Sequence, residues 1–381
     1  MIESRTVYTS SGEASREPGR SHTYRIPALA VTKQGALLAF AEARHGSAGD
    51  CGDIGIVVRR SDDGGRTWGP ERTVLDQGLD TTGNPCPVVL DSGRILLLAC
   101  WNSGRIEETG IAPGFGADSR RVFELYSDDD GETWSEAREI TRDVKRADWC
   151  WYATGPGAGI QLTRGPHTGR VIIPCDHKAG EGYHSHIVYS DDDGETWAIG
   201  AVSPNGLNEC EAVELSNGDV MLNCRNHGQP RLVHRGVCIS RDGGKTFDEA
   251  LFRRAETLVE PRCQASIRRL SWPEGPPSSE ISASAKATAG QAGVASGAPG
   301  LIVFANPAVD CDRCRMTVRG SYDDGETWAW SRLVYEGSAA YSDLAALPDG
   351  RIGLLYEKDE SGKIEFAAFP PPGKRESETV E

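Results

Sequence analysis

Short apolar runs separated by polar turns follow one another along most of the chain. Examples are Ala36–Phe40 and Ile54–Arg60, and turn sequences such as Asp91-Ser-Gly93 divide one run from the next. Short runs rich in β-branched and apolar residues, bounded by Gly, Asn, Asp and Ser, are typical of β-strands rather than helices. The pattern therefore predicts an all-β protein.

An eight-residue motif, S-x-D-x-G-x-T-[WF], recurs at irregular intervals between these runs. Its five copies are Ser61–Trp68, Ser127–Trp134, Ser190–Trp197, Ser240–Phe247 and Ser321–Trp328. Each copy lies between two predicted strands, which indicates a hairpin loop. The Asp can accept hydrogen bonds from turn N–H groups, the Gly can adopt a positive φ, and the aromatic residue can pack between strands. The copies lack the ligand order of an EF-hand, so we interpret them as structural turns and not as calcium sites.

Strand–loop–strand repeats with variable insertions predict a β-propeller. The motif resembles the Asp-boxes of the sialidase (neuraminidase) superfamily. The predicted strands fall into six blades, each a four-stranded antiparallel sheet. The last blade, built from Ser342–Leu347, Arg351–Tyr356 and Ile364–Phe369, lacks a motif and has one strand too few. We predict that the N-terminal strand Thr6–Tyr8 pairs with it and closes the ring.

The repeats indicate one propeller domain over residues 1–381. They recur from Ser61 to Trp328, which argues for one large ring. In the third blade the innermost strand is predicted at Gly159–Leu162. Residues 272–300 interrupt the fifth blade and are rich in Ala, Ser, Gly and Pro, so we expect this insert to be disordered.

The net charge of −15 argues against nucleic acid as a partner. No apolar run is long enough to span a bilayer, and the first residues lack the layout of a signal peptide. The eleven cysteines lie mostly within strand-like runs. These features predict a soluble, cytoplasmic protein with reduced thiols, and we expect a monomer.

Two cysteines, Cys311 and Cys314, have the C-x-x-C spacing of half a zinc or redox site. No second pair and no paired histidines complete a tetrahedron. We therefore expect neither a metal nor a cofactor.

Three arginines are predicted at inner positions of the propeller. Arg25 stands in Tyr24-Arg-Ile-Pro27, where a guanidinium beside apolar neighbours at the start of an inner strand indicates a polar cavity. Arg225 and Arg313 occupy comparable inner positions in the fourth and fifth blades, and Arg315 is the competitor for Arg313. Three such forks at one axis would bind a carboxylate.

The Tyr-Arg-Ile-Pro motif, the three arginines and the Asp-boxes together resemble an exo-sialidase. The resemblance implies a tyrosine nucleophile at Tyr341 and a glutamate partner at Glu209 in Asn208-Glu-Cys-Glu211, both expected at the starts of inner strands. A phenol suits this substrate because the anomeric carbon of a sialic acid carries a carboxylate, which would repel an anionic nucleophile. The glutamate can remove the phenolic proton during attack. Strand parity alone leaves Glu211 open as an alternative.

By the same resemblance, the acid/base residue belongs to the glycine-rich loop 46–53, which offers Asp50 and Asp53. Asp50 is the better match. Arg44, Asn84 and Gln264 resemble residues that contact the sugar. The tyrosines that often line the glycerol pocket of the family are absent after Pro174, where this chain has Cys175-Asp-His177.

The resemblance implies an exo-α-sialidase that removes terminal sialic acid from glycans with retention through a tyrosyl intermediate. A non-catalytic Asp-box propeller that binds glycans or a protein is the alternative from another class. A third possibility is a hydrolase or transferase for another 2-keto acid sugar. Convergence of the arginines, Tyr341 and Glu209 would favour an enzyme.

Overall fold

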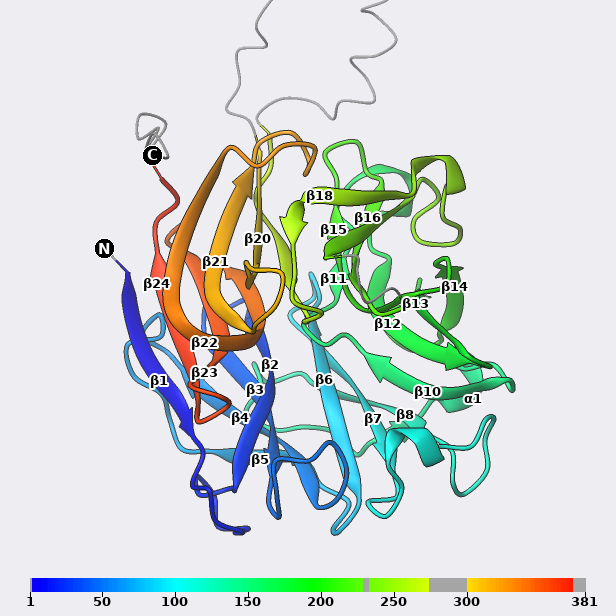
Figure 1. Cartoon of the computed structure of the whole chain (residues 1–381), viewed down its shortest axis with the longest axis vertical. Coiled ribbons are helices and arrows are strands. Elements are labelled where there is room, and N and C mark those ends of the chain that lie inside the picture. Colours follow the sequence, from blue (N-terminus) through cyan, green and yellow to red (C-terminus); the bar gives the residue numbers. More distant parts are fainter. Residues whose placement is uncertain (1, 229–232, 274–299, 373–381) are drawn as a thin grey trace, which may run out of the picture.

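The computed structural model describes residues 2–228, 233–273 and 300–372. These residues form a ring of antiparallel sheets around a central axis (Figure 1). The all-β prediction is confirmed, and the strand pairings divide into six blades of four main strands each.

The first three blades follow one another along the chain. Blade 1 comprises β2 (Thr23–Val31), β3 (Leu37–Arg44), β4 (Ile54–Ser61) and β5 (Arg72–Leu75). Blade 2 comprises β6 (Thr81–Val89), β7 (Ile95–Asn102), β8 (Arg121–Ser127) and β9 (Arg138–Glu139). Blade 3 comprises β10 (Trp149–Thr154), β11 (Ile160–Gln161), β12 (Val171–Ala179), β13 (Gly182–Ser190) and β14 (Ala198–Val202).

The last three blades complete the ring. Blade 4 comprises β15 (Leu207–Glu214), β16 (Val220–Asn226), β17 (His234–Ser240) and β18 (Arg253–Val259). Blade 5 comprises β19 (Ser266–Ser271), β20 (Leu301–Pro307), β21 (Cys314–Ser321) and the first part of β22 (Trp330–Ala346). Blade 6 comprises the rest of β22, β23 (Ile352–Lys358), β24 (Lys363–Phe369) and β1 (Glu3–Thr9). Short helices lie in the connections: η1 (Glu108–Gly110), α1 (Thr141–Val144), η2 (Gly165–His167) and η3 (Glu249–Leu251).

The N-terminal strand closes the ring, as predicted. β1 pairs antiparallel with β24, with Glu3 opposite Ala368 and Thr9 opposite Lys363. The core face of β1 buries Val7 and Tyr8, and the Tyr8 hydroxyl donates to the Ala39 carbonyl of blade 1 at 2.7 Å. The strand therefore joins blade 6 to blade 1.

Two strand predictions needed correction. The innermost strand of blade 3 is split into β10 and β11, and the prediction at Gly159–Leu162 found only the second piece. In addition, Tyr341 lies inside the long strand β22 and not at the start of a strand. β22 pairs with β21 as far as Ser338 and with β23 from Ala339 onward, so one strand crosses from blade 5 to blade 6.

The Asp-boxes are hairpin loops between the third and fourth strands of blades 1 to 5. In the first copy, Asp63 accepts hydrogen bonds from the Ser61 hydroxyl at 2.8 Å and the Thr67 amide at 2.9 Å. The Gly65 amide donates to the Ser61 hydroxyl at 2.9 Å. Blade 6 has no box because its third and fourth strands, β24 and β1, are not consecutive in the chain.

Each box also packs against the preceding blade. A Cβ on Gly65 would come within 2.1 Å of Phe366 in blade 6, and one on Gly131 within 2.5 Å of Leu38 in blade 1. Gly194, Gly244 and Gly325 likewise face Leu96, Ile172 and Met221 of blades 2, 3 and 4. The boxes therefore fasten neighbouring blades, and the junction of blades 5 and 6, which has none, is the one that β22 crosses.

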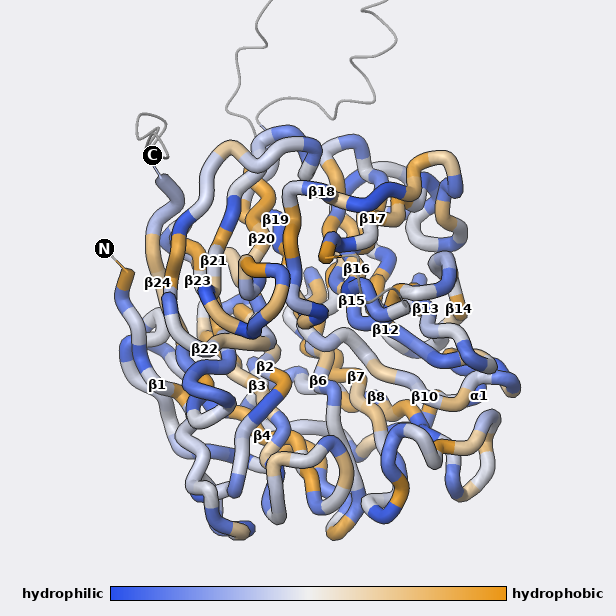
Figure 2. Tube along the Cα trace, viewed as in Figure 1, coloured by the Kyte–Doolittle hydropathy of each residue, from blue (hydrophilic) through white to orange (hydrophobic). Residues whose placement is uncertain are grey.

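The hydrophobic core lies between the blades. One cluster joins blades 1 and 2 around Phe40 and Leu97, and another joins blades 2 and 3 around Leu98 and Ile173. Similar clusters fill the other junctions among the described residues. In Figure 2 the hydrophobic colour is concentrated on the strands, in keeping with the apolar runs of the sequence.

The expected disorder of 272–300 falls mainly on residues 274–299, which lie outside the described residues. Within the part of the chain that the structure describes, no helix is long and apolar enough to cross a membrane.

Candidate active site

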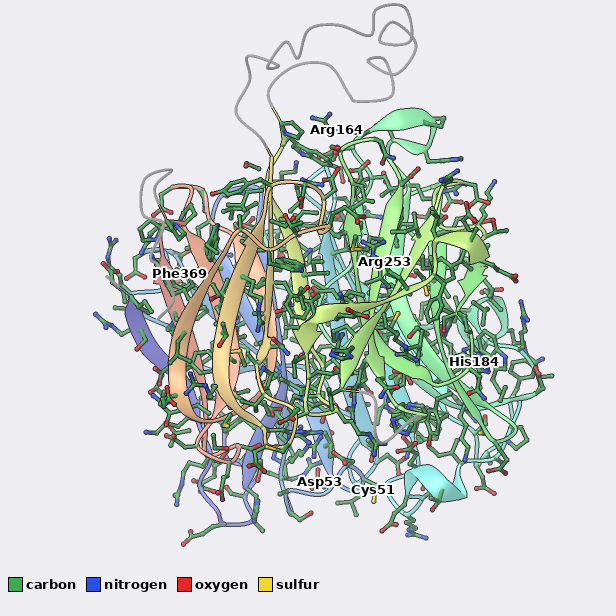
Figure 3. All side chains as sticks on the ribbon, turned by 45° about the horizontal axis from the view of Figure 1, so that its top comes forward. Cys51, Asp53, Arg164, His184, Arg253 and Phe369 are labelled. Atoms are coloured by element: carbon green, nitrogen blue, oxygen red, sulfur yellow. The ribbon has the colours of Figure 1, made fainter. Side chains whose placement is uncertain are left out.

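A polar cavity of about 210 Å³ lies at one mouth of the central axis. It opens at the ends where the first strands of the blades begin. Figure 3 labels Cys51 and Asp53 on the loop at this mouth, and Arg164 near the opposite one. The residues that line the cavity come from all six blades and are Arg25, Ile26, Glu42, Arg44, Asp50, Thr81, Asn84, Glu108, Arg120, Trp151, Asp176, Tyr183, Asn208, Glu209, Arg225, His227, Arg313 and Tyr341.

β-Bulges in the innermost strands aim side chains into this cavity. The pairing register shifts between Gly83 and Cys86, between Leu207 and Cys210, and between Ala339 and Ser342. The first strands of blades 1 and 3 carry similar shifts near the same mouth. A bulge bends its strand and re-aims the unpaired residues. Asn84, Trp151, Glu209 and Tyr341 are such residues, which explains how continuous strands present polar groups to one point.

Tyr341 and Glu209 meet at the centre of the cavity. The Tyr341 phenol donates a hydrogen bond to Glu209 Oε1, and Arg225 Nη1 donates to the phenolic oxygen at 3.0 Å and also to Glu209 Oε2. Tyr341 is only 6 % exposed. The structure thus brings these two predicted residues into direct contact, and a shared guanidinium fixes the pair.

The surroundings set the charge of each partner. Burial and the Glu209 carboxylate raise the pKa of Tyr341 well above its ordinary value, so the phenol is neutral at rest. Burial opposes ionisation of Glu209, but Arg225 and the hydrogen bond from Tyr341 hold the pKa of Glu209 below its ordinary value. The pair is therefore an ionised base hydrogen-bonded to a protonated nucleophile.

The three predicted arginines surround the tyrosine. The guanidinium of Arg25 lies 5.0 Å from the centre of the Tyr341 ring, and that of Arg313 lies 5.5 Å away. Arg225 lies near the end of β16, and Arg313 lies just before β21, so neither is at the start of an inner strand as Arg25 is. The three arginines still meet. The end of the second strand of a blade and the start of its third strand lie at the same mouth of the axis as the start of its first strand. Arg315 instead pairs with Glu336 and is not among the lining residues.

Arg25 is held by a residue that the sequence analysis missed. Glu357 accepts from Arg25 Nε at 3.1 Å and from Nη2 at 3.3 Å. It also accepts the Ile26 amide at 2.9 Å. Ile26 has φ of 54°, a conformation that β-branched residues rarely adopt. Glu357 therefore fixes both the guanidinium and the strained backbone beside it.

The glycine-rich loop places Asp50 and not Asp53 at the cavity. Asp50 Oδ1 lies 2.7 Å from Arg44 Nη1 and 3.3 Å from Arg25 Nη1. Asp53 pairs with Arg16 outside the lining. Loss of solvation opposes ionisation of Asp50, but Arg44 and Arg25 outweigh it and hold the pKa of Asp50 below its ordinary value. Asp50 is thus a carboxylate in the free protein.

Arg44 and Asn84 also line the cavity, as expected. Glu42 binds Arg44 Nη2 at 2.7 Å and accepts the Asn84 amide at 2.9 Å, so this buried carboxylate orients both residues. Asn84 has φ of 55°, a conformation that Asn tolerates better than most residues.

Gln264 is not brought to the cavity. Its side chain is fully buried and forms hydrogen bonds with the backbone of two other blades. The amide donates to the Ser342 carbonyl at 2.9 Å and to the Pro156 carbonyl at 3.1 Å, and its oxygen accepts the Ser342 amide at 2.9 Å. Gln264 therefore supports the residue next to Tyr341 and has no free group for a sugar.

Glu211, the alternative to Glu209, contacts blade 5 outside the cavity. It is fully buried, pairs with Arg268 at 2.8 Å and accepts the amide of Ile267. Burial and the nearby Asp343 raise the pKa of Glu211 well above its ordinary value. It does not line the cavity, so the geometry favours Glu209.

The rest of the wall was not predicted. It includes Arg120, whose guanidinium lies 4.1 Å from the Trp151 ring centre, and the rim pair Tyr183–His227, with ring centres 4.1 Å apart. The sequence signal that could have found such wall residues is a polar residue within a strand-like apolar run, such as Asp176 after Ile173-Pro174. Among the described residues no cluster of three or more His, Cys, Asp and Glu side chains could hold a metal ion.

This arrangement can bind a small anion and transfer a group through a phenol. The cationic side of the cavity fits a carboxylate, and the neutral nucleophile with its base stands next to it. The fold and the site together define a six-bladed Asp-box propeller with a polar, arginine-lined cavity at one mouth of its axis.

Comparison with known proteins is consistent with this class. Residues 35–354 match the family model of a BNR repeat-like domain. A sialidase of Micromonospora viridifaciens is 38 % identical over 357 residues, which cover 91 % of this chain and 51 % of that protein. Sialidase-3 of Mus musculus is 31 % identical, with 91 % of each chain covered. The chain belongs to the sialidase family, and it spans about half the length of the Micromonospora protein.

Solved structures agree. A Hadza microbial sialidase superposes with a TM-score of 0.77 at 32 % identity over 92 % of this chain and 66 % of its own. The intramolecular trans-sialidase of Ruminococcus gnavus superposes with a TM-score of 0.76 over 96 % of this chain and 97 % of its own. At 20 % identity the second likeness supports the fold alone.

Proposed function

We propose that the protein is an exo-α-sialidase that hydrolyses terminal sialic acid from glycans with retention of configuration. The observation that carries the proposal is the Tyr341–Glu209 hydrogen bond inside a cage of three arginines. A propeller that only bound glycans would need the arginines but not a buried phenol paired with an ionised base.

In the first step the arginines hold the substrate carboxylate and Tyr341 attacks the anomeric carbon. The phenolic proton moves to Glu209 as the bond forms, which lets a group with a raised pKa act as a nucleophile. The bond to the glycan oxygen breaks, and that oxygen takes a proton from Asp50. The product is a tyrosyl-linked sugar.

Asp50 must gain a proton for this role. In the free protein it is ionised because it lies against Arg44 and Arg25. A bound substrate carboxylate would engage Arg25 and place a negative charge nearby, and both effects raise the pKa of Asp50. In the second step Asp50 accepts a proton from a water that attacks the anomeric carbon. The bond from that carbon to the Tyr341 oxygen breaks, and this oxygen recovers its proton from Glu209.

The proposal is tested with an aryl α-ketoside of N-acetylneuraminic acid followed by proton NMR. We expect the α-anomer of the free sugar to appear first and to equilibrate later. Tyr341→Phe should abolish turnover without a change in thermal unfolding, because it removes only the attacking oxygen. Absence of turnover by the wild type, or release of the β-anomer first, would reject the proposal.

The role of Asp50 has its own test. Asp50→Ala should slow hydrolysis of an alkyl ketoside by about 10²- to 10⁴-fold, the usual contribution of a general acid. A ketoside with a nitrophenyl leaving group should lose much less activity in its first step, because that oxygen needs no proton. Equal losses for both substrates would mean that Asp50 is not the acid.

We also propose a reducing, cytoplasmic location. All eleven cysteines are unpaired and most of them are buried, as expected for structural thiols. Fractionation of the native source with thiol labelling would test this proposal.

A further inference from the structure

Each of the two residues that react is followed, two positions later, by a fully buried carboxyl group. Glu211 follows Glu209 on β15, and Asp343 follows Tyr341 on β22. Neither carboxyl group lines the active-site cavity, and the proposed reaction uses neither. Burial of a carboxyl group is costly unless the group is paired, so the arrangement needs a structural reason.

The bulges make the reacting residues dependent on the strands that carry them. Glu209 and Tyr341 lie where the register of β15 and of β22 shifts, whereas Glu211 and Asp343 lie in the regular part of the same strands. The extra residue of a bulge is left unpaired by the sheet. The distance between Glu209 and Tyr341 therefore depends on how the regular parts of β15 and β22 are placed relative to each other.

Both buried carboxyl groups bind the same nitrogen of one arginine. Arg268 Nη2 lies 2.8 Å from Glu211 Oε1 and 3.4 Å from Asp343 Oδ1. Arg268 belongs to β19, the innermost strand of blade 5, which lies between the blade of Glu211 and the blade of Asp343. β15 and β22 are not paired with each other in any sheet that the structure describes. The guanidinium of Arg268 therefore bridges two strands that no backbone ladder connects.

Backbone amides hold each carboxyl group in place. Asp343 Oδ2 accepts the Leu29 amide of blade 1 at 2.7 Å. Glu211 Oε2 accepts the Ile267 amide of blade 5 at 2.5 Å, and Glu211 Oε1 accepts the Ala158 amide of blade 3 at 3.3 Å. Neither carboxyl group can turn without leaving a buried amide unpaired, which is unfavourable. A shift of Arg268 would therefore move the strands and not only the two side chains.

We propose that Arg268 is a positioning residue for the reaction. By holding Glu211 and Asp343, it sets the separation of β15 and β22 and thereby the hydrogen bond between Glu209 and Tyr341. This inference rests on the proposed function, because it takes Tyr341 as the nucleophile and Glu209 as its base.

The carboxylate-binding arginines are held by other contacts. Arg25 is fixed by Glu357, and Arg313 donates to the Arg262 carbonyl at 3.2 Å. Loss of Arg268 should therefore slow the attack of the nucleophile and leave the affinity for a carboxylate ligand nearly unchanged.

The test measures the rate of attack and the affinity separately. With the enzyme in excess over a nitrophenyl α-ketoside of N-acetylneuraminic acid, nitrophenol release in a single turnover reports formation of the tyrosyl-linked sugar. Arg268→Met should slow this step about 10- to 100-fold, because a displacement of reacting groups by about 1 Å can cost about 100-fold. Calorimetry with an unsaturated sialic-acid analogue should show a change in Kd of less than about threefold, as expected for a group that acts on the chemical step.

Arg268→Lys is the conservative variant. A single nitrogen of Arg268 reaches both carboxyl groups, so an ammonium group at this position can bridge them although it lacks the guanidinium fork. The single-turnover rate should therefore recover to within about fivefold of the wild-type rate. A folded Arg268→Lys protein as slow as Arg268→Met would reject the bridge as the reason for the effect.

Arg269→Met is the matched control. Arg269 lies in the same strand, but it binds the Glu214 carbonyl and Asp324 instead of Glu211 and Asp343. Its loss should lower the temperature of thermal unfolding without a change in the single-turnover rate. A rate as low as that of Arg268→Met would show a general effect of blade 5 and would reject the assignment to Arg268.

The outcomes separate this inference from the proposed function. Absence of turnover by the wild type rejects the proposed function before any variant is made. With an active wild type, the positioning role is rejected if Arg268→Met keeps the wild-type rate, or loses rate and analogue affinity by the same factor. If Arg268→Met does not fold, Asp343→Asn decides by the same two criteria, because it weakens the link to β22 and keeps the ion pair between Arg268 and Glu211.

Discussion

Replacement of Gln264 by glutamate should make the stability of the protein depend on pH, because the side chain that supports Ser342 would then titrate. Gln264 donates to the carbonyls of Ser342 and Pro156 and accepts the Ser342 amide, with no exposed surface. A neutral carboxyl group in its place can accept the amide and donate to one carbonyl. An ionised one would direct its charge at both carbonyls in a buried place.

The size of the loss in folding free energy follows from the number of buried carbonyl groups that lose their hydrogen bond. An ionised carboxylate at this position would leave the two carbonyls unpaired, and each buried unpaired group costs about 1–3 kcal/mol. The expected loss is therefore at least about 2 kcal/mol at neutral pH, a substantial part of a typical folding free energy of about 5–15 kcal/mol. Burial also raises the folded-state pKa of the new carboxyl above its unfolded value of about 4.3.

The sign of the pH dependence follows from that raised pKa. Stability of Gln264→Glu should be nearest to wild type below about pH 4.3 and should be lost as pH rises through the higher folded-state pKa. Urea unfolding between about pH 4 and about pH 8 measures this loss. Gln161→Glu is a comparison at a partly buried site: Gln161 donates to the Gly169 carbonyl and accepts the Asp91 amide, and it also donates to Asp193 Oδ1 at 3.3 Å.

Activity measurements distinguish a structural role of Gln264 from direct contact of its side chain with the sugar. A support beside Tyr341 should affect kcat and stability together, whereas a sugar contact should affect KM. A Gln264→Glu protein with wild-type stability at about pH 8 and a raised KM would refute the reasoning.

Three further predictions follow from other parts of the structure. Arg225→Lys should weaken binding of an unsaturated sialic-acid analogue by more than about tenfold, because an ammonium cannot reproduce the planar fork of donors with which a guanidinium pairs with a carboxylate; calorimetry that shows wild-type affinity would contradict it. Hydrogen bonds from Thr133 lower the pKa of Asp129 to about 2, so its contribution to stability is complete above pH 3.8 and is lost as pH falls toward 2. Asp129→Asn should flatten the dependence of unfolding free energy on pH in that range. An unchanged slope would show that folding does not lower the pKa of Asp129. Deletion of residues 274–299 should leave kcat/KM unchanged, because the flanking Trp272 lines a separate cavity at the opposite mouth; a loss of activity without unfolding would contradict this.

The ring itself could be predicted because its signals are local. Five copies of one turn motif and the apolar runs around them define strands, hairpins and blades without knowledge of long-range contacts. The closing strand was predicted by counting the strands of each blade, since blade 6 lacked one. Arg25 was indicated by its apolar neighbours at the start of an inner strand, whereas Glu209 and Tyr341 were found through a resemblance that a chain with fewer matching motifs would not have offered.

The details of the site could not be predicted because they depend on backbone irregularities. A bulge shifts which residues face the axis, and strand parity, which left Glu209 and Glu211 equivalent, does not hold across one. Glu357 lies in a strand that reads as an ordinary buried strand. Its role depends on a positive φ at Ile26, which is not encoded in local spacing.

The closure of the ring has a consequence for how the protein is made. Arg25 belongs to the first blade of the ring to leave the ribosome and Tyr341 to the last, and the two blades are joined by the pairing of β1 with β24 and by direct contacts such as that of Arg25 with Glu357. Until then β1 has no partner strand, and the growing sheet has an exposed edge of the kind that promotes aggregation. A nascent chain that ends after blade 5 would already carry the three arginines and Glu209 but would lack the nucleophile, so catalysis should appear only after blade 6 has been made.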